Sequence, residues 1–462
     1  MASTINSDNG VVSGSMGLKY SADATGNLVL QTAGNTVVTL DTGLNANFTG
    51  TVSAVGNVTG GNVRTAGLIT ATGNVQSGNI LTTGLISSTG NVQSGNILTS
   101  GAVSAAGTVN ALNTFGFENR IINGGMTIDQ RNAGASVTPT SGQYLVDRFS
   151  ALLTQASKYT AQQNAASVTP PVGFINYLGI TSSSAYSVLA GDFFAIVHKI
   201  EGLNVADLAW GTASAKTVTL SFQVRSSLTG TFGGNLKNSA GNRSYPFTYS
   251  IPTANTWTAI SVTIAGDTSG TWLTTNGIGI EVDFGLGVGS TYSGTAGSWS
   301  ANNYVSATGA TSVVGTNAAT WYVTGVQLEV GSQATSFDFR DYGRELMLCQ
   351  RYFQKSISQS VAVGTAVGDI RAFPNIDIPV SIAGQALSLY CWFKTTMRTI
   401  PTIAYYDGTG TVSKITGIAS STAQTTGVSL NDVQATDNGV QFRAYDIPYY
   451  GFGLYYTATA EL

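Results

Sequence analysis

The feature that most constrains this 462-residue chain is an exact repeat. The phrase TGNVQSGNILT occupies residues 72–82 and returns unchanged at residues 89–99, and a looser copy begins at Gly56. A second marker, read as GTVS, GLIT, GLIS and GAVS, begins at residues 50, 67, 84 and 101 and keeps the same period of 17 residues. A fixed period of short units is typical of a solenoid or a fibrous shaft.

The apolar residues inside one repeat predict short strands. Val75, Ile80 and Leu85 lie five residues apart, which fits neither a helix stripe nor one long strand. Arg64 is the only charged residue between positions 43 and 114. Because so few coils bury little apolar area on their own, we predict that residues 43–114 form a β-structured shaft in which three chains wind together. A flexible linker and a one-chain β-solenoid are the alternatives.

Composition excludes several classes of function. Charged residues make up 9% of the chain against about 25% in an average protein, the net charge is −3, and no basic stripe favours nucleic-acid binding. Two cysteines are too few for a disulfide framework, and no Cys or His spacing indicates a metal site. No cofactor is expected. No apolar run is long enough for a membrane span, and the start MASTINSDNG lacks a secretory pattern, so we expect synthesis in a cytoplasm.

The middle of the chain, residues 115–337, reads as a β-sandwich. Alternating apolar and polar residues occupy positions 216–226, 256–266, 278–287 and 320–331. In the first run Val218, Leu220 and Phe222 share one face, as in a half-buried antiparallel strand. Several such runs with glycine-rich turns predict an all-β fold of jelly-roll type.

One helix is predicted at residues 338–356, between the sandwich and an all-β C-terminal module at residues 357–462. A four, three, four spacing marks its apolar seam, formed by Tyr342, Leu346, Cys349 and Phe353. Such a seam can form a three-helix collar around a fibre axis, or it can pack one helix on its own sandwich. The two alternatives stay open.

Three segments resemble phage tail fibres and related receptor-binding tail proteins: NRIINGGMTIDQRNAG (119–134), YLVDRF (144–149) and TGVQLEVGSQATSFDFRDYGRELMLCQRYFQ (324–354). The opening segment 3–32 and the close, from MRTIPTIAYYDGTGTVSKI to YYTATAEL, are similar to the ends of the same proteins. The resemblance implies a homotrimeric virion fibre with a jelly-roll module like that of carbohydrate-binding proteins. It also implies attachment to tail or baseplate proteins through residues 1–42 and adsorption to host surface polysaccharide.

Few residues suggest catalysis. His198, the only histidine, has no nucleophile motif beside it, and we expect a structural role. Glu281 and Asp283 share one face of a predicted strand, and paired carboxylates can hydrolyse a glycosidic bond. We place both on the wet face of the strand and expect no enzyme.

Sugar binding needs flat rings beside hydrogen-bonding groups. The candidates lie in loop-like or turn-like stretches and are Trp257, Trp272, Trp299, Tyr304, Tyr406, Tyr445, Tyr449 and Tyr450. Trp321 and Trp392 lie in alternating strands, so we expect them in the core. The sequence therefore predicts multivalent, non-covalent binding of host glycans by a trimer. A structural tail connector, a polysaccharide depolymerase and a trimeric bacterial adhesin are the alternatives.

Overall fold

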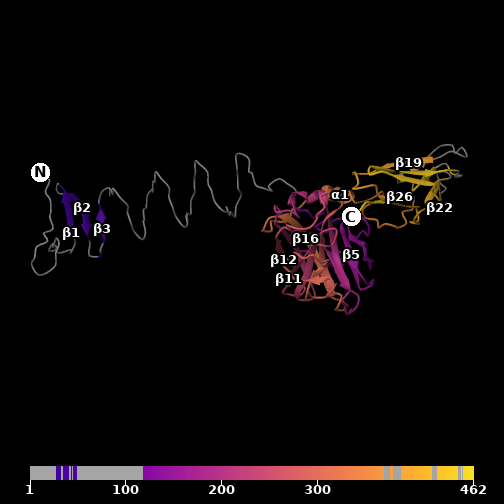
Figure 1. The fold of residues 1–462 in the computed structure, drawn as a ribbon. Coiled ribbons are helices and arrows are strands. Elements are labelled where there is room, and N and C mark those ends of the chain that lie inside the picture. The colour runs from indigo at the N-terminus through magenta and orange to yellow at the C-terminus, as the bar shows by residue number, and fades with distance from the viewer. Residues whose placement is uncertain are drawn as a thin grey trace, which may run out of the picture. The chain divides into compact units, whose positions relative to one another are not determined.

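A computed structural model describes residues 28–32, 35–40, 43, 45–48, 118–368, 375–377, 387–418, 424–445, 449 and 451–462. The chain forms two compact units, Met1–Ser104 and Ala105–Leu462. The described strands of the first unit make one antiparallel sheet, in the order β1 (Leu28–Thr32), β2 (Asn35–Leu40) and β3 (Ala46–Phe48) (Figure 1). Most of the predicted shaft, including both exact repeats, lies outside the described residues, so the shaft and the predicted domain boundaries stay predictions.

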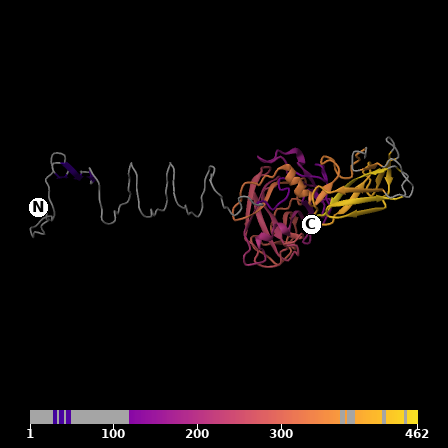
Figure 2. The ribbon, with the colours of Figure 1, turned by 90° about the horizontal axis from the view of Figure 1, so that it is seen from above.

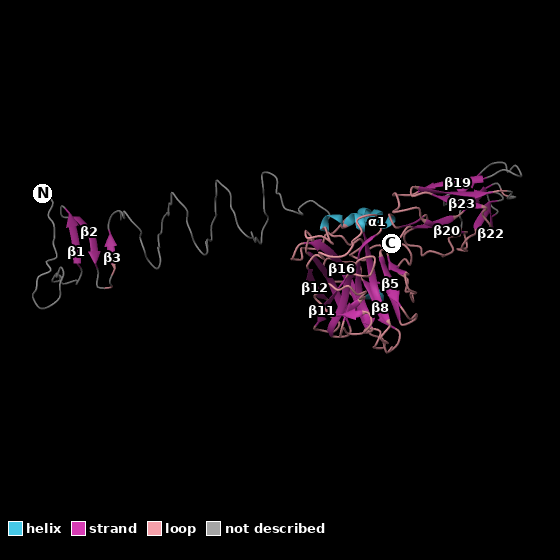
Figure 3. Cartoon of the chain, viewed as in Figure 1, coloured by secondary structure: helices cyan, strands magenta, loops and turns pink. Residues whose placement is uncertain are grey.

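The second unit begins with two antiparallel sheets packed face to face, and the predicted jelly-roll type of sandwich is confirmed (Figure 3). The six-stranded sheet has the order β11 (Ser244–Ile251), β10 (Gly230–Lys237), β13 (Ile278–Val288), β8 (Phe193–Glu201), β5 (Phe149–Leu153) and β4 (Tyr144–Val146). The five-stranded sheet has the order β12 (Thr258–Ile264), β9 (Val218–Ser226), β16 (Thr320–Val330), β7 (Leu178–Ser182) and β6 (Tyr159–Gln163). Short 3-10 turns η1 (Ala165–Ser167), η2 (Gly202–Asn204) and η3 (Ala206–Leu208) lie in its connections.

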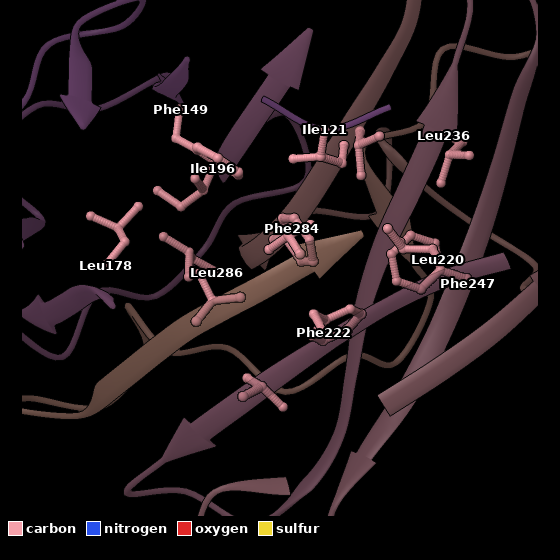
Figure 4. Close-up of a cluster of buried hydrophobic side chains, with 14 of the residues drawn as sticks. Ile121, Phe149, Leu178, Ile196, Leu220, Phe222, Leu236, Phe247, Phe284 and Leu286 are labelled. Carbon is pink, nitrogen blue, oxygen red and sulfur yellow. The ribbon is translucent and has the colours of Figure 1, made fainter. Parts of the chain in front are cut away.

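Alternation along the strands builds the core between the sheets (Figure 4). Phe222 from β9 and Phe284 from β13 face each other across the sandwich, with ring centroids 5.1 Å apart. Trp321 is fully buried in the same core, as predicted. Each such ring stabilises the fold by roughly 1.5–3 kcal/mol through loss of water contact.

A strap, defined as residues 293–311, covers the outer face of the six-stranded sheet. It contains the parallel pair β14 (Ser293–Gly294) and β15 (Ser306–Ala307), and Val305 packs on Ala195 and Val197 of β8. The sheet beneath has no side chain where the strap comes closest, since a Cβ on Gly233 would lie 2.4 Å from the Ser306 hydroxyl. The outer face of the five-stranded sheet therefore remains the more open one.

Helix α1 (Tyr342–Gln350) begins at Asp341, whose carboxylate accepts a hydrogen bond from the Arg344 amide at 2.9 Å. The predicted seam is not continuous on this helix. Phe353 lies in the following strand β17 (Phe353–Lys355), and Tyr342 is exposed while Leu346 is half-buried. Cys349 is fully buried against Ile122, Ile128 and Tyr352 of its own chain. The helix thus packs on its own sandwich, which is the second of the two predicted arrangements.

The C-terminal module consists of three small sheets, drawn in yellow in Figure 2. Their orders are β17–β26 (Tyr455–Thr459)–β20 (Thr402–Tyr406), β18 (Asn375–Asp377)–β25 (Gly451–Gly453)–β21 (Ile415–Ile418)–β22 (Gln424–Val428), and β19 (Leu387–Trp392)–β24 (Gly439–Ala444)–β23 (Asp432–Ala435). Glu461 joins this module to the sandwich through salt bridges to Arg131, at 3.0 Å, and to Arg148. Two further contacts join the end of the helix to the sandwich. Arg351 pairs with the buried Glu201 at 2.6 Å, and the Tyr352 hydroxyl donates to the same carboxylate at 2.7 Å.

The prediction that Trp392 belongs to the core is wrong. Its side chain is 80% exposed, because Leu387, Leu389 and Cys391 form the buried face of β19 and Trp392 points to the opposite face. In the described part of the chain, no helix has the length and apolar character needed to cross a membrane.

Candidate functional site

A groove of about 400 Å³ runs over the outer face of the five-stranded sheet; we call it the sheet groove. Its floor comes from neighbouring strands in register, with Ser221 of β9 opposite Ser261 of β12, and Gln223 opposite Ala259. These residues alternate with the core residues Leu220, Phe222 and Val224, so the strand period itself places them outside.

Three phenylalanine rings form one wall of the sheet groove. Phe174, Phe337 and Phe339 contact one another, with centroid distances of 4.8–5.2 Å. The side chain of Phe339 is 62% exposed. A ring exposed at the edge of a hollow can bind a ligand favourably, because binding removes its apolar face from water.

A bulge in β16 lets this wall approach the sheet. The register of β16 against β9 shifts between Thr324 and Gln327, and Gly325 within the shift has a φ of +63°. A Cβ at this glycine would lie 2.6 Å from the ring of Phe174. Glycine is therefore required both by the left-handed backbone and by the ring that covers it.

The polar floor is free to bind a ligand. Within the described residues, the side chains of Ser221, Gln223 and Ser261 form no hydrogen bond to the protein, and all three are half-buried or exposed. An amide and two hydroxyls supply donors and acceptors beside an apolar wall. This combination matches a sugar, which presents hydroxyl edges and an apolar C–H face.

Trp257, one of the predicted binding residues, directly precedes β12, two residues before Ala259. Its indole N–H donates to the Thr169 carbonyl at 2.9 Å, and its ring meets Tyr177 edge to face at 5.6 Å. Arg225 lies 5.5 Å above the ring of the neighbouring Tyr322. Trp257 is thus half-buried in a second aromatic cluster beside the sheet groove.

The other candidates in the sandwich have structural contacts. Trp272 is buried, and its ring packs edge to face on Trp210 and Trp299 at 4.8 and 5.4 Å. The Trp299 indole donates to the Ala265 carbonyl at 2.8 Å. Tyr304 belongs to the strap, where its ring covers Gly294. None of these three lines the sheet groove.

The candidates of the C-terminal module are dispersed. Tyr406 stacks on the buried Tyr455 with centroids 4.8 Å apart and an angle of 8° between the rings. The ring of Tyr449 covers Gly417, and Tyr445 is exposed. Tyr450 lies outside the described residues.

The carboxylate pair is not on a wet face, which corrects the prediction. Asp283 is fully buried and Glu281 nearly so, and the Lys237 ammonium lies 2.8 Å from Glu281 and 3.4 Å from Asp283. Burial raises the pKa of Asp283, although the Lys237 charge opposes the rise. The strap closes over this side of the sheet, so the three charges form a buried structural network.

His198 is completely buried, with its ring 4.8 Å from that of Phe149 and its Nε2 against the Ile122 backbone. Burial lowers its pKa well below the usual value. This placement fits the expected structural role. In the described ranges, no group of three or more His, Cys, Asp or Glu side chains is placed to hold a metal ion.

Sequence reasoning missed the residues of the sheet groove. The alternation of Phe337 and Phe339 within SFDFR was visible and could have indicated a surface pair of rings. Phe174 could not have been found, because it reaches the site from a distant loop. Ser221 and Gln223 alternate with the predicted apolar face of Leu220 and Phe222, but nothing local indicated that their own face stays open.

Comparison with known proteins gives similarity to solved structures alone, since no family model and no curated protein matches. The enzymatically active domain of tailspike protein 4 from bacteriophage CBA120 aligns at 12% identity and a TM-score of 0.24 over 46% of this chain, and the chain covers only 21% of that domain's length. A CBM4 structure aligns at 15% identity and a TM-score of 0.23, covering 46% of this chain and 99% of the other. The family 11 carbohydrate-binding module from Clostridium thermocellum, in complex with a β-1,3-1,4-mixed-linked tetrasaccharide, aligns at 12% identity and a TM-score of 0.22, covering 43% and 98%. All three TM-scores lie below 0.5.

Proposed function

We propose that this chain is a receptor-binding fibre protein of a phage tail that binds host surface glycans through the sheet groove. The observation that supports the proposal is the groove itself, in which uncommitted polar groups of Ser221, Gln223 and Ser261 lie beside the exposed ring of Phe339. The proposed mechanism is non-covalent. Hydroxyl groups of a sugar bond to the polar floor while its apolar face packs on the phenylalanine wall.

One shallow site gives weak binding, so the proposal includes three copies of the chain on one axis. Linked sites raise the effective concentration of the second and third binding events and can increase avidity by about 10²–10⁴. The N-terminal residues 1–42 attach the fibre to tail proteins in this proposal, and the mature protein resides in the virion.

The test uses the full chain and the variants Phe339→Ala and Gln223→Ala. Binding is measured to immobilised polysaccharides extracted from a panel of bacterial surfaces. We expect each variant to lose about tenfold in affinity, equivalent to about 1.4 kcal/mol. Leu203→Ala, an exposed apolar residue of the same sandwich away from the groove, is the matched control and should bind normally. Unchanged affinity in both groove variants would exclude the sheet groove as the site.

A structural connector is the second candidate, favoured by exposed apolar side chains beside the groove. Val172, Ile175 and Tyr342 are all largely exposed, and the last two line an adjoining cleft of about 280 Å³. Apolar surface of this kind often marks contact with another protein. This candidate would be favoured if the full chain binds purified tail proteins and no polysaccharide. Ile175→Asp should then abolish the binding to tail proteins.

A further inference from the structure

The C-terminal module presents a second surface with the chemistry of a binding site; we call it the aromatic platform. It is the exposed face of the sheet β19–β24–β23. Tyr390 and Trp392 point outward from alternate positions of β19, with side chains 64% and 80% exposed. Alternate residues of a strand lie roughly 7 Å apart, so the two rings form one continuous surface.

Polar residues occupy the positions beside these rings. Strand register places Tyr390 opposite Gln441 of β24, and Gln441 opposite Gln434 of β23. Trp392 lies opposite Gly439, where a Cβ would lie 2.8 Å from the Cys391 carbonyl oxygen, so this position has no room for a side chain beside the ring. A hollow of about 300 Å³ lies over these residues.

The platform is pre-organised. The Gln441 amide donates to the Tyr390 hydroxyl at 2.5 Å, and the Gln434 amide donates to the Asp432 carboxylate at 3.0 Å. These bonds fix the amide planes. Gln434 is exposed, whereas Gln441 is only 9% exposed and borders the hollow. A site whose groups are already ordered loses less conformational entropy on binding.

The platform is also electrically balanced. Arg443 and Asp432 lie in the adjoining row of the sheet, 3.7 Å apart between Nη1 and Oδ2, and so offset each other. The Arg443 side chain also reaches Tyr390, but its charge is offset by Asp432, and the other polar side chains that line the hollow, Gln434, Thr436 and Gln441, are uncharged. This face complements a neutral ligand rich in hydroxyl groups.

We propose that the aromatic platform is a second saccharide site, specific for neutral sugars, which stack on Trp392 and Tyr390 and bond to Gln441. A second copy of this chain is a less suitable occupant, because the register neighbours of both rings are polar or glycine and protein interfaces are most apolar at their centre. The inference rests on the proposed glycan-binding function and extends it to two separate sites per chain.

The experiment compares Trp392→Ala and Gln441→Ala with the full unsubstituted chain. The probes are immobilised neutral homopolysaccharides (a glucan, a galactan and a mannan) and polygalacturonate as an acidic counterpart. We expect each variant to lose at least tenfold in affinity for the neutral polysaccharide that the chain binds. Neither variant should change the affinity for polygalacturonate. Trp392→Phe should restore part of the affinity, and Ile400→Ala, an exposed residue of the same module, should change nothing.

A second readout reports on the platform directly. The highly exposed Trp392 indole should be quenched by acrylamide, and the bound neutral polysaccharide should protect it. Light scattering of Trp392→Ala then separates the occupants, because a decrease in molecular mass would show that the face joins copies of the chain and would overturn the proposal.

The outcomes distinguish the two sites. If Phe339→Ala abolishes all binding and Trp392→Ala has no effect, the proposed function holds and the platform proposal fails. If the reverse occurs, the platform is a site and the sheet groove is not. If the unsubstituted chain binds no neutral polysaccharide, the platform proposal is refuted, even if the groove binds an acidic polysaccharide.

Discussion

His198 shows how a single buried residue connects the fold to pH. Its ring is enclosed between Phe149 and the Ile122 backbone, and the positive charges of Arg148 and Arg340 lie near enough to oppose its protonation further. Burial therefore keeps the imidazole neutral in the folded chain. Because the sequence contains only this one histidine, its titration can be isolated.

We predict that stability linked to His198 is present above pH 6.5 and is lost as the pH falls. The unfolded histidine binds a proton with a pKa of about 6.5, whereas burial lowers the pKa in the folded state well below that value. Between pH 7.5 and 5.5, the free energy of unfolding should fall by about 1.4 kcal/mol relative to that of His198→Gln.

Urea denaturation of both proteins at the two pH values tests this prediction. Asp147, whose pKa burial raises to about 6, contributes with the opposite sign in both proteins, so the comparison removes its effect. NMR of the unsubstituted protein provides an independent check. A histidine ring signal that titrates with a normal midpoint would contradict the prediction.

At the scale of elements, the bulge of β16 decides whether the sheet groove exists. A regular strand would continue the ladder with β9 and would have no room for the Phe174 ring above it. The extra residue and the left-handed Gly325 bring ring and sheet together.

We predict that Gly325→Ala weakens both stability and glycan binding. The left-handed backbone alone should cost about 1–2 kcal/mol, and the new methyl group should also displace Phe174 from the groove wall. Urea denaturation and polysaccharide affinity are the two measurements. Gly309→Ala is the matched control, since Gly309 has a φ of +80° in the same sandwich with open space around its Cβ position. The Gly309→Ala variant should lose stability but keep its affinity for polysaccharide. If Gly325→Ala also kept full affinity, the position of Phe174 would be unimportant for binding.

The strands themselves could be predicted because alternation is a local property. The predicted runs 216–226, 256–266, 278–287 and 320–331 correspond to β9, β12, β13 and β16 within two residues. The helix was found as well, but Phe353 was assigned to it wrongly. A spacing of four residues continues past Gln350, whereas the chain turns there and pairs Phe353 with Thr459 of β26, which no local pattern reveals.

At the scale of the whole molecule, the first unit suggests assembly. Leu30, Leu40 and Phe48 of its small sheet are between 41% and 49% exposed in a single chain. Apolar side chains on such a small sheet gain stability when other copies cover them. This observation supports, at the N-terminal end, the trimer that the repeats predict.

We predict that the purified full chain is a trimer, with a mass three times the 47.6 kDa of one chain. Light scattering behind a sizing column measures this mass directly. Leu40→Asp should weaken the trimer, because a charge would then be buried between copies, while Leu203→Asp on the sandwich should leave it intact. A monomer at micromolar concentration would refute the fibre and leave a linker or a one-chain solenoid for the repeats.

The sequence by itself determined the β-rich class, the main sandwich strands and the presence of one helix, because periods of two and of about 3.6 residues are written along the chain. It did not determine which face of a strand is buried. Trp392 was assigned to the buried face of its strand but is exposed, and the face of Glu281 and Asp283 was correctly placed opposite the core but wrongly expected to be wet. Alternation separates two faces, but only the packing of distant segments decides which face is covered. The strap buries the carboxylates. In the part of the chain that the structure describes, no segment covers the face of β19 that carries Trp392, so its side chain is exposed.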